Sequence, residues 1–191
     1  MRKERLEAFS DGILAIIITI MVLDLRVPHG GALTDLQPMV PIFLSYVLSF
    51  VNLGIYWNNH HHLFTAAEKV DGAVMWANLH LLFWLSLVPF TTAWMGENHF
   101  MSAPSAVYGF VLLMAGMAYF ILVRSILRLE GPKSVLAVAV GEDRKGQISP
   151  LLYLVAIPLA FVSPWISGAL YVTVALMWVV PDRRIEKVIV K

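Results

Sequence analysis

Long stretches without a charged side chain constrain this sequence more than any other feature. Asp, Glu, Lys and Arg are all absent from 37–67, 72–96, 98–123 and 146–181. Each stretch holds one or two segments close to the roughly 20 residues that a helix needs to cross about 30 Å of hydrocarbon. Charged residues make up 14% of the 191 positions, against about 25% in a soluble domain. The sequence therefore predicts an integral membrane protein.

The predicted fold is an all-α membrane protein with six transmembrane helices, forming one domain over 1–191. A segment in lipid has to satisfy its own backbone hydrogen bonds, and a helix does so. Alternating ten-residue segments, which mark membrane β-barrels, do not occur in the sequence. The expected spans are about 9–27, 40–63, 72–95, 104–127, 148–163 and 165–181.

The basic residues predict the orientation of these spans. Lys and Arg gather in the cytoplasmic loops of membrane proteins. With the N-terminus inside, the cytoplasmic side holds thirteen of the fourteen Lys and Arg residues, and only Arg26 lies outside. We therefore expect a multi-pass protein of the cell membrane with both termini in the cytoplasm. The inside segments are 1–8, 64–71, 128–147 and 182–191, together with Arg124 at a helix end.

The composition and the helical spacing of the polar residues argue against a metal site. The chain has no cysteine, which excludes disulfides, thiolate nucleophiles and cysteine metal ligands. Three consecutive histidines, His60 to His62, invite a metal hypothesis. Successive residues of a helix point about 100° apart, however, so the three cannot face one ion. No metal, cofactor or nucleic-acid partner is expected.

The first span carries an apolar stripe. On an ideal helix Ile20 and Leu23 lie within about 40° of Ile16, and Thr19 lies about 60° from it. Such a stripe serves as an ordinary contact with lipid or with another helix. It also suits a pore, because rings of aliphatic side chains form a constriction that gates by dewetting. In a pore, a ring of threonine hydroxyls would replace part of an ion's hydration shell. Helical geometry leaves both readings open.

Polar residues at the inner ends of the first three spans predict a structural network. Ser10 and Asp11 lie about 120° and 140° from Ile16, so they point away from the stripe. Asp11 could relay protons or accept hydrogen bonds between helices, and its direction favours the second role. Polar groups in lipid pair with one another. The predicted structural network consists of Arg5, Ser10, Asp11, Trp57, His60, His61, Asn78 and His80.

The residues Arg5-x-x-x-Phe9-Ser10-Asp11-Gly12 resemble the signature of the transmembrane protein 175 family of potassium channels. The cluster of Trp57, His60, His61 and Phe64 and the segment Leu87-Val-Pro-Phe90-Thr are similar to that family as well. The resemblance extends over essentially the whole chain. A single six-span repeat resembles the bacterial and archaeal members, which assemble as tetramers.

This resemblance implies a homotetrameric potassium channel surrounded by membrane lipid, with no catalytic step. The first helix of each subunit would line the pore, with potassium and other monovalent cations as permeant species. Ile16 falls on the family's constricting position, Ile20 and Leu23 on the next hydrophobic positions, and Thr19 on the polar ring that contributes to selectivity. A secondary transporter and a proton-permeable channel are the alternatives. A transporter would favour inverted repeats and broken helices, for which Pro158 alone gives thin support.

Overall fold

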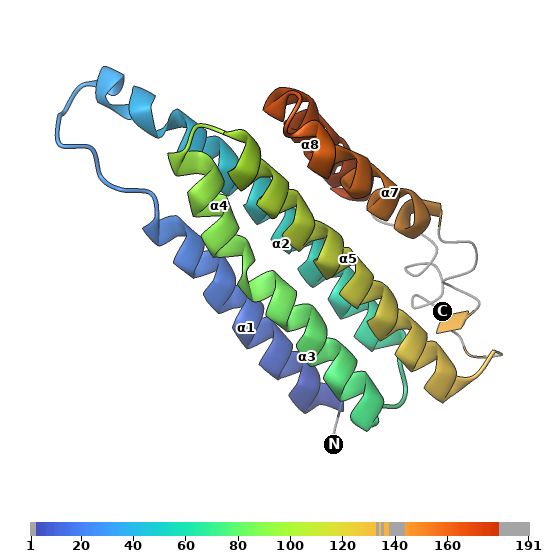
Figure 1. Ribbon diagram of the computed structural model, residues 1–191. Coiled ribbons are helices and arrows are strands. Elements are labelled where there is room, and N and C mark those ends of the chain that lie inside the picture. The colour runs from blue at the N-terminus through green and yellow to red at the C-terminus, as the bar shows by residue number, and fades with distance from the viewer. Residues whose placement is uncertain (1–2, 133, 135, 138–143, 180–191) are drawn as a thin grey trace.

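The computed structural model describes residues 3–132, 134, 136–137 and 144–179. These residues form a bundle of long helices, with a shorter helical pair packed along one side (Figure 1). The first helix, α1, reaches a long loop that leads through a 3-10 helix, η1, directly into α2. The elements are α1 (Lys3–Leu23), η1 (Leu33–Met39), α2 (Val40–Ala66), α3 (Gly72–Ser86), α4 (Val88–Glu97), α5 (Ser102–Glu130), α7 (Arg144–Leu159) and α8 (Pro164–Val179).

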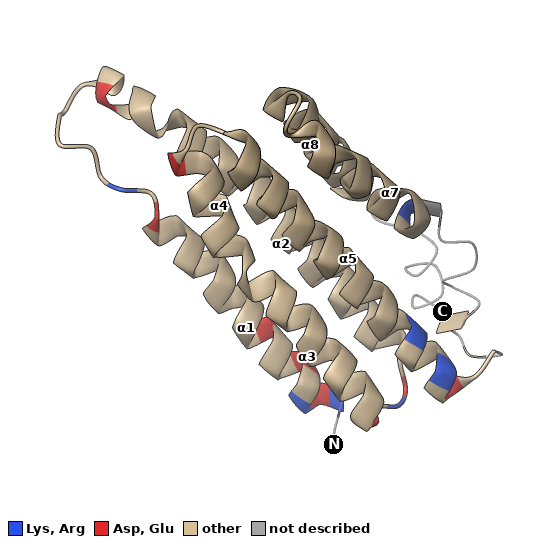
Figure 2. Cartoon of the chain, viewed as in Figure 1, with Lys and Arg blue, Asp and Glu red and all other residues tan. Residues whose placement is uncertain are grey.

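The distribution of charge along the bundle fits a membrane protein. Charged side chains gather at the two ends of the helices, and the ribbon between those ends is almost free of them (Figure 2). Four segments of the described chain are long and apolar enough to cross a membrane: Lys3–Leu23, Leu33–Ala66, Gly72–Glu97 and Ser102–Glu130. Counting α3 and α4 as one interrupted rod and setting the 3-10 helix η1 aside, the elements with described bounds form six α-helices. The predicted all-α membrane fold is confirmed.

The rod over the expected span 72–95 is interrupted. It consists of α3 and α4, which follow one another along the bundle with Leu87 between them (Figure 1). Pro89 lies in the first turn of α4. Proline has no N–H, and its ring clashes with the carbonyl four residues earlier, so it disturbs a continuous helix. The break therefore follows from a residue whose effect the hydropathy pattern does not register.

The pair α7 and α8 forms a hairpin on the far side of the bundle from α1 (Figure 1). Tyr171 of α8 is completely buried, and its hydroxyl donates to Ser105 O of α5 at 3.0 Å. Its ring packs edge-on against Tyr108 of α5, with 5.6 Å between the ring centroids. A side chain at Gly109 would overlap the Tyr171 hydroxyl. Tyr171 thus helps to fix the hairpin on α5, against which α7 packs as well.

Replacing Gly96 by alanine is expected to destabilise the subunit by about 1–3 kcal/mol, the usual cost of overpacking. A Cβ at Gly96 would lie 2.8 Å from the Cα of Ile42 and would also overlap the Ser45 hydroxyl, so the backbones of α4 and α2 would have to separate. Gly54→Ala is the matched control, because a Cβ there meets nothing within 4 Å. That control is expected to be neutral or to stabilise by about 0.5–1 kcal/mol. Unfolding midpoints in detergent show whether each variant is less or more stable than the wild type. Equal effects of the two substitutions would contradict the prediction.

Candidate pore-lining face and its polar network

The helix α1 has one buried face and one face that nothing in the subunit covers. The buried face carries Leu6, Ser10, Leu14, Ile17 and Met21, and α1 packs there against α2, α3 and α4. On the other face the exposed fractions are 58% for Ile16, 46% for Ile20 and 77% for Leu23. The stripe expected from the sequence therefore lies on the uncovered side of the subunit.

Thr19 lies on the same uncovered face. Its hydroxyl is 2.9 Å from Ile16 O and 3.0 Å from Ala15 O, and it donates to these carbonyls of its own helix. A hydroxyl has one hydrogen and two lone pairs. Because the hydrogen is used within α1, the oxygen is left as an acceptor. A ring of such oxygens would suit a cation rather than an anion.

A buried chain of hydrogen bonds ties α1 to α3 and α2. Asn78 Nδ2 donates to Ser10 Oγ at 2.9 Å, and Ser10 Oγ donates in turn to Leu6 O at 2.9 Å. On the other side, His60 Nε2 lies 2.8 Å from Asn78 Oδ1. That amide oxygen only accepts, so His60 donates through Nε2. Ser10, Asn78 and His60 are all buried, which makes this three-residue chain, called the Ser10–Asn78–His60 chain below, the best-shielded polar contact of α1.

The other residues of the predicted network lie nearer the surface. Trp57 Nε1 donates to Asp11 Oδ1 at 3.1 Å, a second link between α2 and α1. His61 stacks on Trp57, with 6.3 Å between ring centroids. His80 lies apart from the Ser10–Asn78–His60 chain, because its Nε2 accepts from Trp84 Nε1 of the same rod at 2.9 Å. Arg5 is exposed at the start of α1 and forms no ion pair with any described residue.

The three consecutive histidines diverge as their helical spacing requires. His60 is buried against Phe64, with 4.5 Å between the ring centroids, whereas His61 is exposed. No three His, Asp or Glu side chains of the described residues come close enough together to hold a metal ion.

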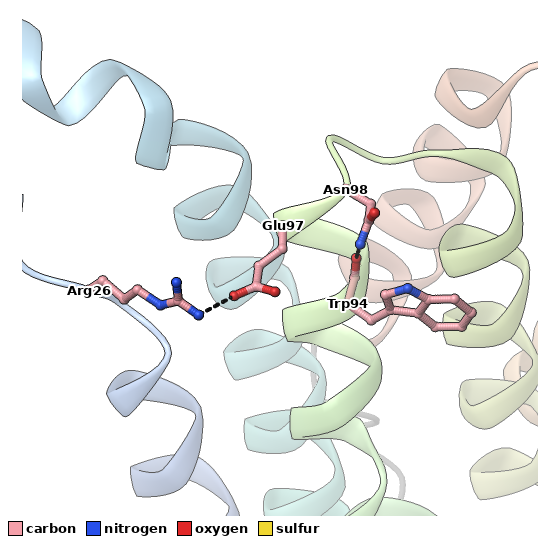
Figure 3. A network of polar contacts seen from close by, with 4 residues as sticks. All are labelled: Arg26, Trp94, Glu97 and Asn98. Atoms are coloured by element: carbon pink, nitrogen blue, oxygen red, sulfur yellow. Dashed lines mark hydrogen bonds and ion pairs between the residues drawn. The ribbon is translucent and has the colours of Figure 1, made fainter.

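The opposite end of α1 is joined to α4 by an exposed ion pair. Nη2 of Arg26, just beyond α1, lies 3.0 Å from Glu97 Oε1 (Figure 3). Beside this ion pair, Asn98 Nδ2 donates to Trp94 O at 2.9 Å. Burial raises the pKa of the Asp24 carboxyl above its usual range, the Glu97 carboxylate raises it further, and Arg26 opposes both. An exposed pair of this kind contributes at most about 1 kcal/mol. This contact therefore positions the loop after α1 more than it stabilises the bundle.

A cluster of hydroxyls that the sequence reasoning missed joins α2, α4 and α5. Ser49 Oγ lies 2.6 Å from Thr92 Oγ1 and donates to the Tyr108 hydroxyl at 3.0 Å. All three side chains are buried. Their signal was present in α2, where Ser45, Ser49 and Asn52 recur at helical spacing within an apolar span and so share one face.

The arrangement of these helices matches a known family. The sequence profile described as "Endosomal/lysosomal potassium channel TMEM175" matches residues 5–89. A crystal structure of a lysosomal potassium-selective channel TMEM175 homolog from Chamaesiphon minutus has a TM-score of 0.82 at 29% identity, and the match covers 94% of this chain and 97% of that one. A potassium channel of Chryseobacterium sp. (strain P1-3) is 54% identical over 187 residues, which are 98% of this chain and 97% of that protein. The chain belongs to the TMEM175 family.

Membership of the TMEM175 family confirms the resemblance found in the sequence. The match to the Chamaesiphon minutus channel spans nearly the full length of both chains, so it includes the α7–α8 hairpin. A vertebrate relative, the endosomal/lysosomal proton channel TMEM175 of Gallus gallus, is 36% identical over 101 residues. That match covers 47% of this chain and 20% of the vertebrate protein, and is therefore a partial one.

Proposed function

We propose that this protein is a potassium-selective cation channel of the cell membrane that conducts passively. The observation that carries the proposal is the uncovered face of α1. This face carries the aliphatic side chains of Ile16, Ile20 and Leu23 together with the hydroxyl of Thr19. Homologues named potassium channel support it, as does the likeness to a potassium-selective homolog.

The channel requires several copies of the chain. One uncovered helix face cannot enclose an axis, whereas closed cyclic symmetry brings identical faces around one. We infer a homotetramer in which the α1 helices of four subunits surround the pore and lipid surrounds the assembly. Following the distribution of Lys and Arg, both termini lie in the cytoplasm.

Within this pore Ile16 forms the main constriction, and Ile20 and Leu23 extend it. Branched aliphatic side chains offer water and ions no hydrogen bonds, so a narrow ring of them stays dry and closed until it widens. Thr19 contributes to selectivity, because its oxygen remains an acceptor after its hydrogen has bonded within the helix. The Ser10–Asn78–His60 chain holds α1 in register with α2 and α3.

Replacing Thr19 by valine is expected to lower the potassium-to-sodium permeability ratio several-fold while leaving the subunit folded. Valine keeps the shape of threonine and removes the oxygen that would face the ion. Thr173→Val is the matched control, since Thr173 is an exposed threonine of α8 whose hydroxyl makes the same bond within its helix, to Ala169 O at 2.7 Å. Reversal potentials of the purified protein in planar bilayers with mixed potassium and sodium measure the ratio. An unchanged ratio for Thr19→Val would contradict the assignment.

A proton-permeable channel is the second candidate, and the name of the Gallus gallus relative favours it. The two functions differ in the ion that sets the reversal potential. Under a pH gradient with equal potassium on both sides, a proton channel gives a shifted reversal potential and a potassium channel gives none. Resolved unitary currents in the same recordings would exclude a secondary transporter, which turns over too slowly to produce them.

A further inference from the structure

A cavity of about 570 Å³ lies between α2, α5, α7 and α8, away from the uncovered face of α1. It is within the range of about 300–1,000 Å³ that small-molecule sites occupy. Its walls are mostly aliphatic and aromatic, with Ile55 and Tyr56 from α2, Val123 and Leu127 from α5, and Trp178 from α8. Such walls suit the apolar part of a ligand.

Two arginines of α5 give the cavity a positive end. Arg124 and Arg128 both line it, one helical turn apart, close to where α5 ends at Glu130. Their side chains are exposed, and neither forms an ion pair with a residue that the structure describes. The Arg124 guanidinium lies over the Phe120 ring, 4.9 Å from its centroid. The nearest acid along the helix, Glu130, is already engaged as an acceptor for the Glu68 N–H.

The arginines and the apolar walls together describe one class of ligand. A guanidinium presents a planar fork of donors that matches phosphate oxygens. A free phosphate would use the arginines and leave the aliphatic and aromatic walls without a partner. A molecule with a phosphate at one end and a hydrocarbon chain at the other satisfies both parts of the cavity. Basic pockets between transmembrane helices bind anionic lipid headgroups in this way.

We propose that this cavity binds an anionic phospholipid from the membrane leaflet at the end of α5. The phosphate lies against Arg124 and Arg128, and part of an acyl chain enters between α2, α5 and α8. The site is distinct from the conduction path, because no residue of α1 lines the cavity, which is built mainly from α5 and α7 with smaller contributions from α2 and α8. It stands whether or not the pore conducts potassium.

Native mass spectrometry of the purified protein, titrated with dioleoylphosphatidylglycerol or dioleoylphosphatidylcholine, tests the charged end. The wild-type protein is expected to bind phosphatidylglycerol more tightly than phosphatidylcholine. Replacing Arg124 and Arg128 together by glutamine is expected to weaken phosphatidylglycerol binding at least about tenfold, about 1.4 kcal/mol. Lys69→Gln is the control, because Lys69 is an exposed cation of the α2–α3 loop that does not line the cavity. Equal binding by the double variant, the control and the wild type would overturn the proposal.

A cavity-filling variant tests the apolar end. Gly116 of α5 lines the cavity, and a Cβ there would meet only the Tyr56 hydroxyl, at an ordinary contact distance of 3.7 Å. Gly116→Leu therefore fits the fold and occupies space that the acyl chain needs, so lipid binding is expected to weaken at least about tenfold as well. Gly168→Leu is the control, since Gly168 lies on α8 outside the cavity lining and has nothing within 4 Å of a Cβ.

Two further outcomes decide between this site and its rivals. If Gly116→Leu binds phosphatidylglycerol as the wild type does while the arginine variant loses it, the lipid is held at the surface and the cavity assignment is wrong. If inorganic phosphate or glycerol 3-phosphate competes with the lipid at equal concentration, the site recognises a soluble anion and the lipid assignment is wrong. Potassium flux does not enter these measurements, so failure of the lipid site and failure of the proposed channel remain separate results.

Discussion

Replacing Ile16 by asparagine is expected to raise potassium conductance at least about tenfold, which corresponds to a barrier lower by about 1.4 kcal/mol. A ring of isoleucines repels water from a narrow pore, whereas amide groups hydrogen-bond to water and keep the constriction wet. Ile16 is 58% exposed in the subunit, so the substitution removes little buried packing. Single-channel recording in planar bilayers measures the change directly.

The matched control for this experiment is Val22→Asn. Val22 is an apolar residue of α1 that is 43% exposed, comparable with the 46% of Ile20, but it lies about 120° around the helix from Ile16. Val22→Asn therefore introduces the same amide group away from the stripe. The conductance of this variant is expected to stay near that of the wild type. Unchanged currents for Ile16→Asn, or an equal rise for Val22→Asn, would show that the stripe does not line the pore.

Replacing Asn78 by alanine is expected to destabilise the subunit by about 2–3 kcal/mol. The substitution removes both amide contacts at once, the donor to Ser10 Oγ at 2.9 Å and the acceptor for His60 Nε2 at 2.8 Å. Hydrogen bonds between membrane helices contribute about 0.6 kcal/mol on average and up to about 1.7 kcal/mol. The loss is expected to exceed that average, because both partners are buried: the His60 Nε2–H is left without an acceptor, and Ser10 Oγ keeps only its bond to Leu6 O.

Asn98→Ala provides the control for Asn78→Ala. The Asn98 amide donates to Trp94 O over the same distance, 2.9 Å, at a solvent-exposed helix end, where water can replace the lost partner. That variant is expected to change the free energy of unfolding by no more than about 0.5 kcal/mol. Denaturant unfolding in a defined detergent, monitored by tryptophan fluorescence, compares the two. Equal losses would mean that the burial of the Ser10–Asn78–His60 chain adds nothing to its stability.

Much of this architecture could be predicted from local sequence signals. Charge-free stretches predicted a helical membrane protein, because the thickness of the hydrocarbon core fixes the length of a span. Helical periodicity placed Ile16, Ile20 and Leu23 on one side and Ser10 on another. The structure places the first three on the uncovered face of α1 and buries the fourth.

Other features depend on which helices become neighbours. The sequence reasoning placed His60 and His80 in one polar network, but His60 contacts Asn78 across two helices whereas His80 bonds to Trp84 one turn along its own rod. Only the packing of α2 against the α3–α4 rod decides between a distant partner and a local one.

By itself the sequence determined that this chain crosses a membrane as helices, and which side chains share a face of each helix. Both results follow from short-range physics, since hydrophobic length and a 3.6-residue period act within one segment. Only the tertiary structure decided that one face of α1 stays uncovered, that Asn78 completes the Ser10–Asn78–His60 chain, and that Arg124 and Arg128 line a cavity. These features depend on how residues far apart in the chain fill or leave space between helices, and no local pattern encodes that space.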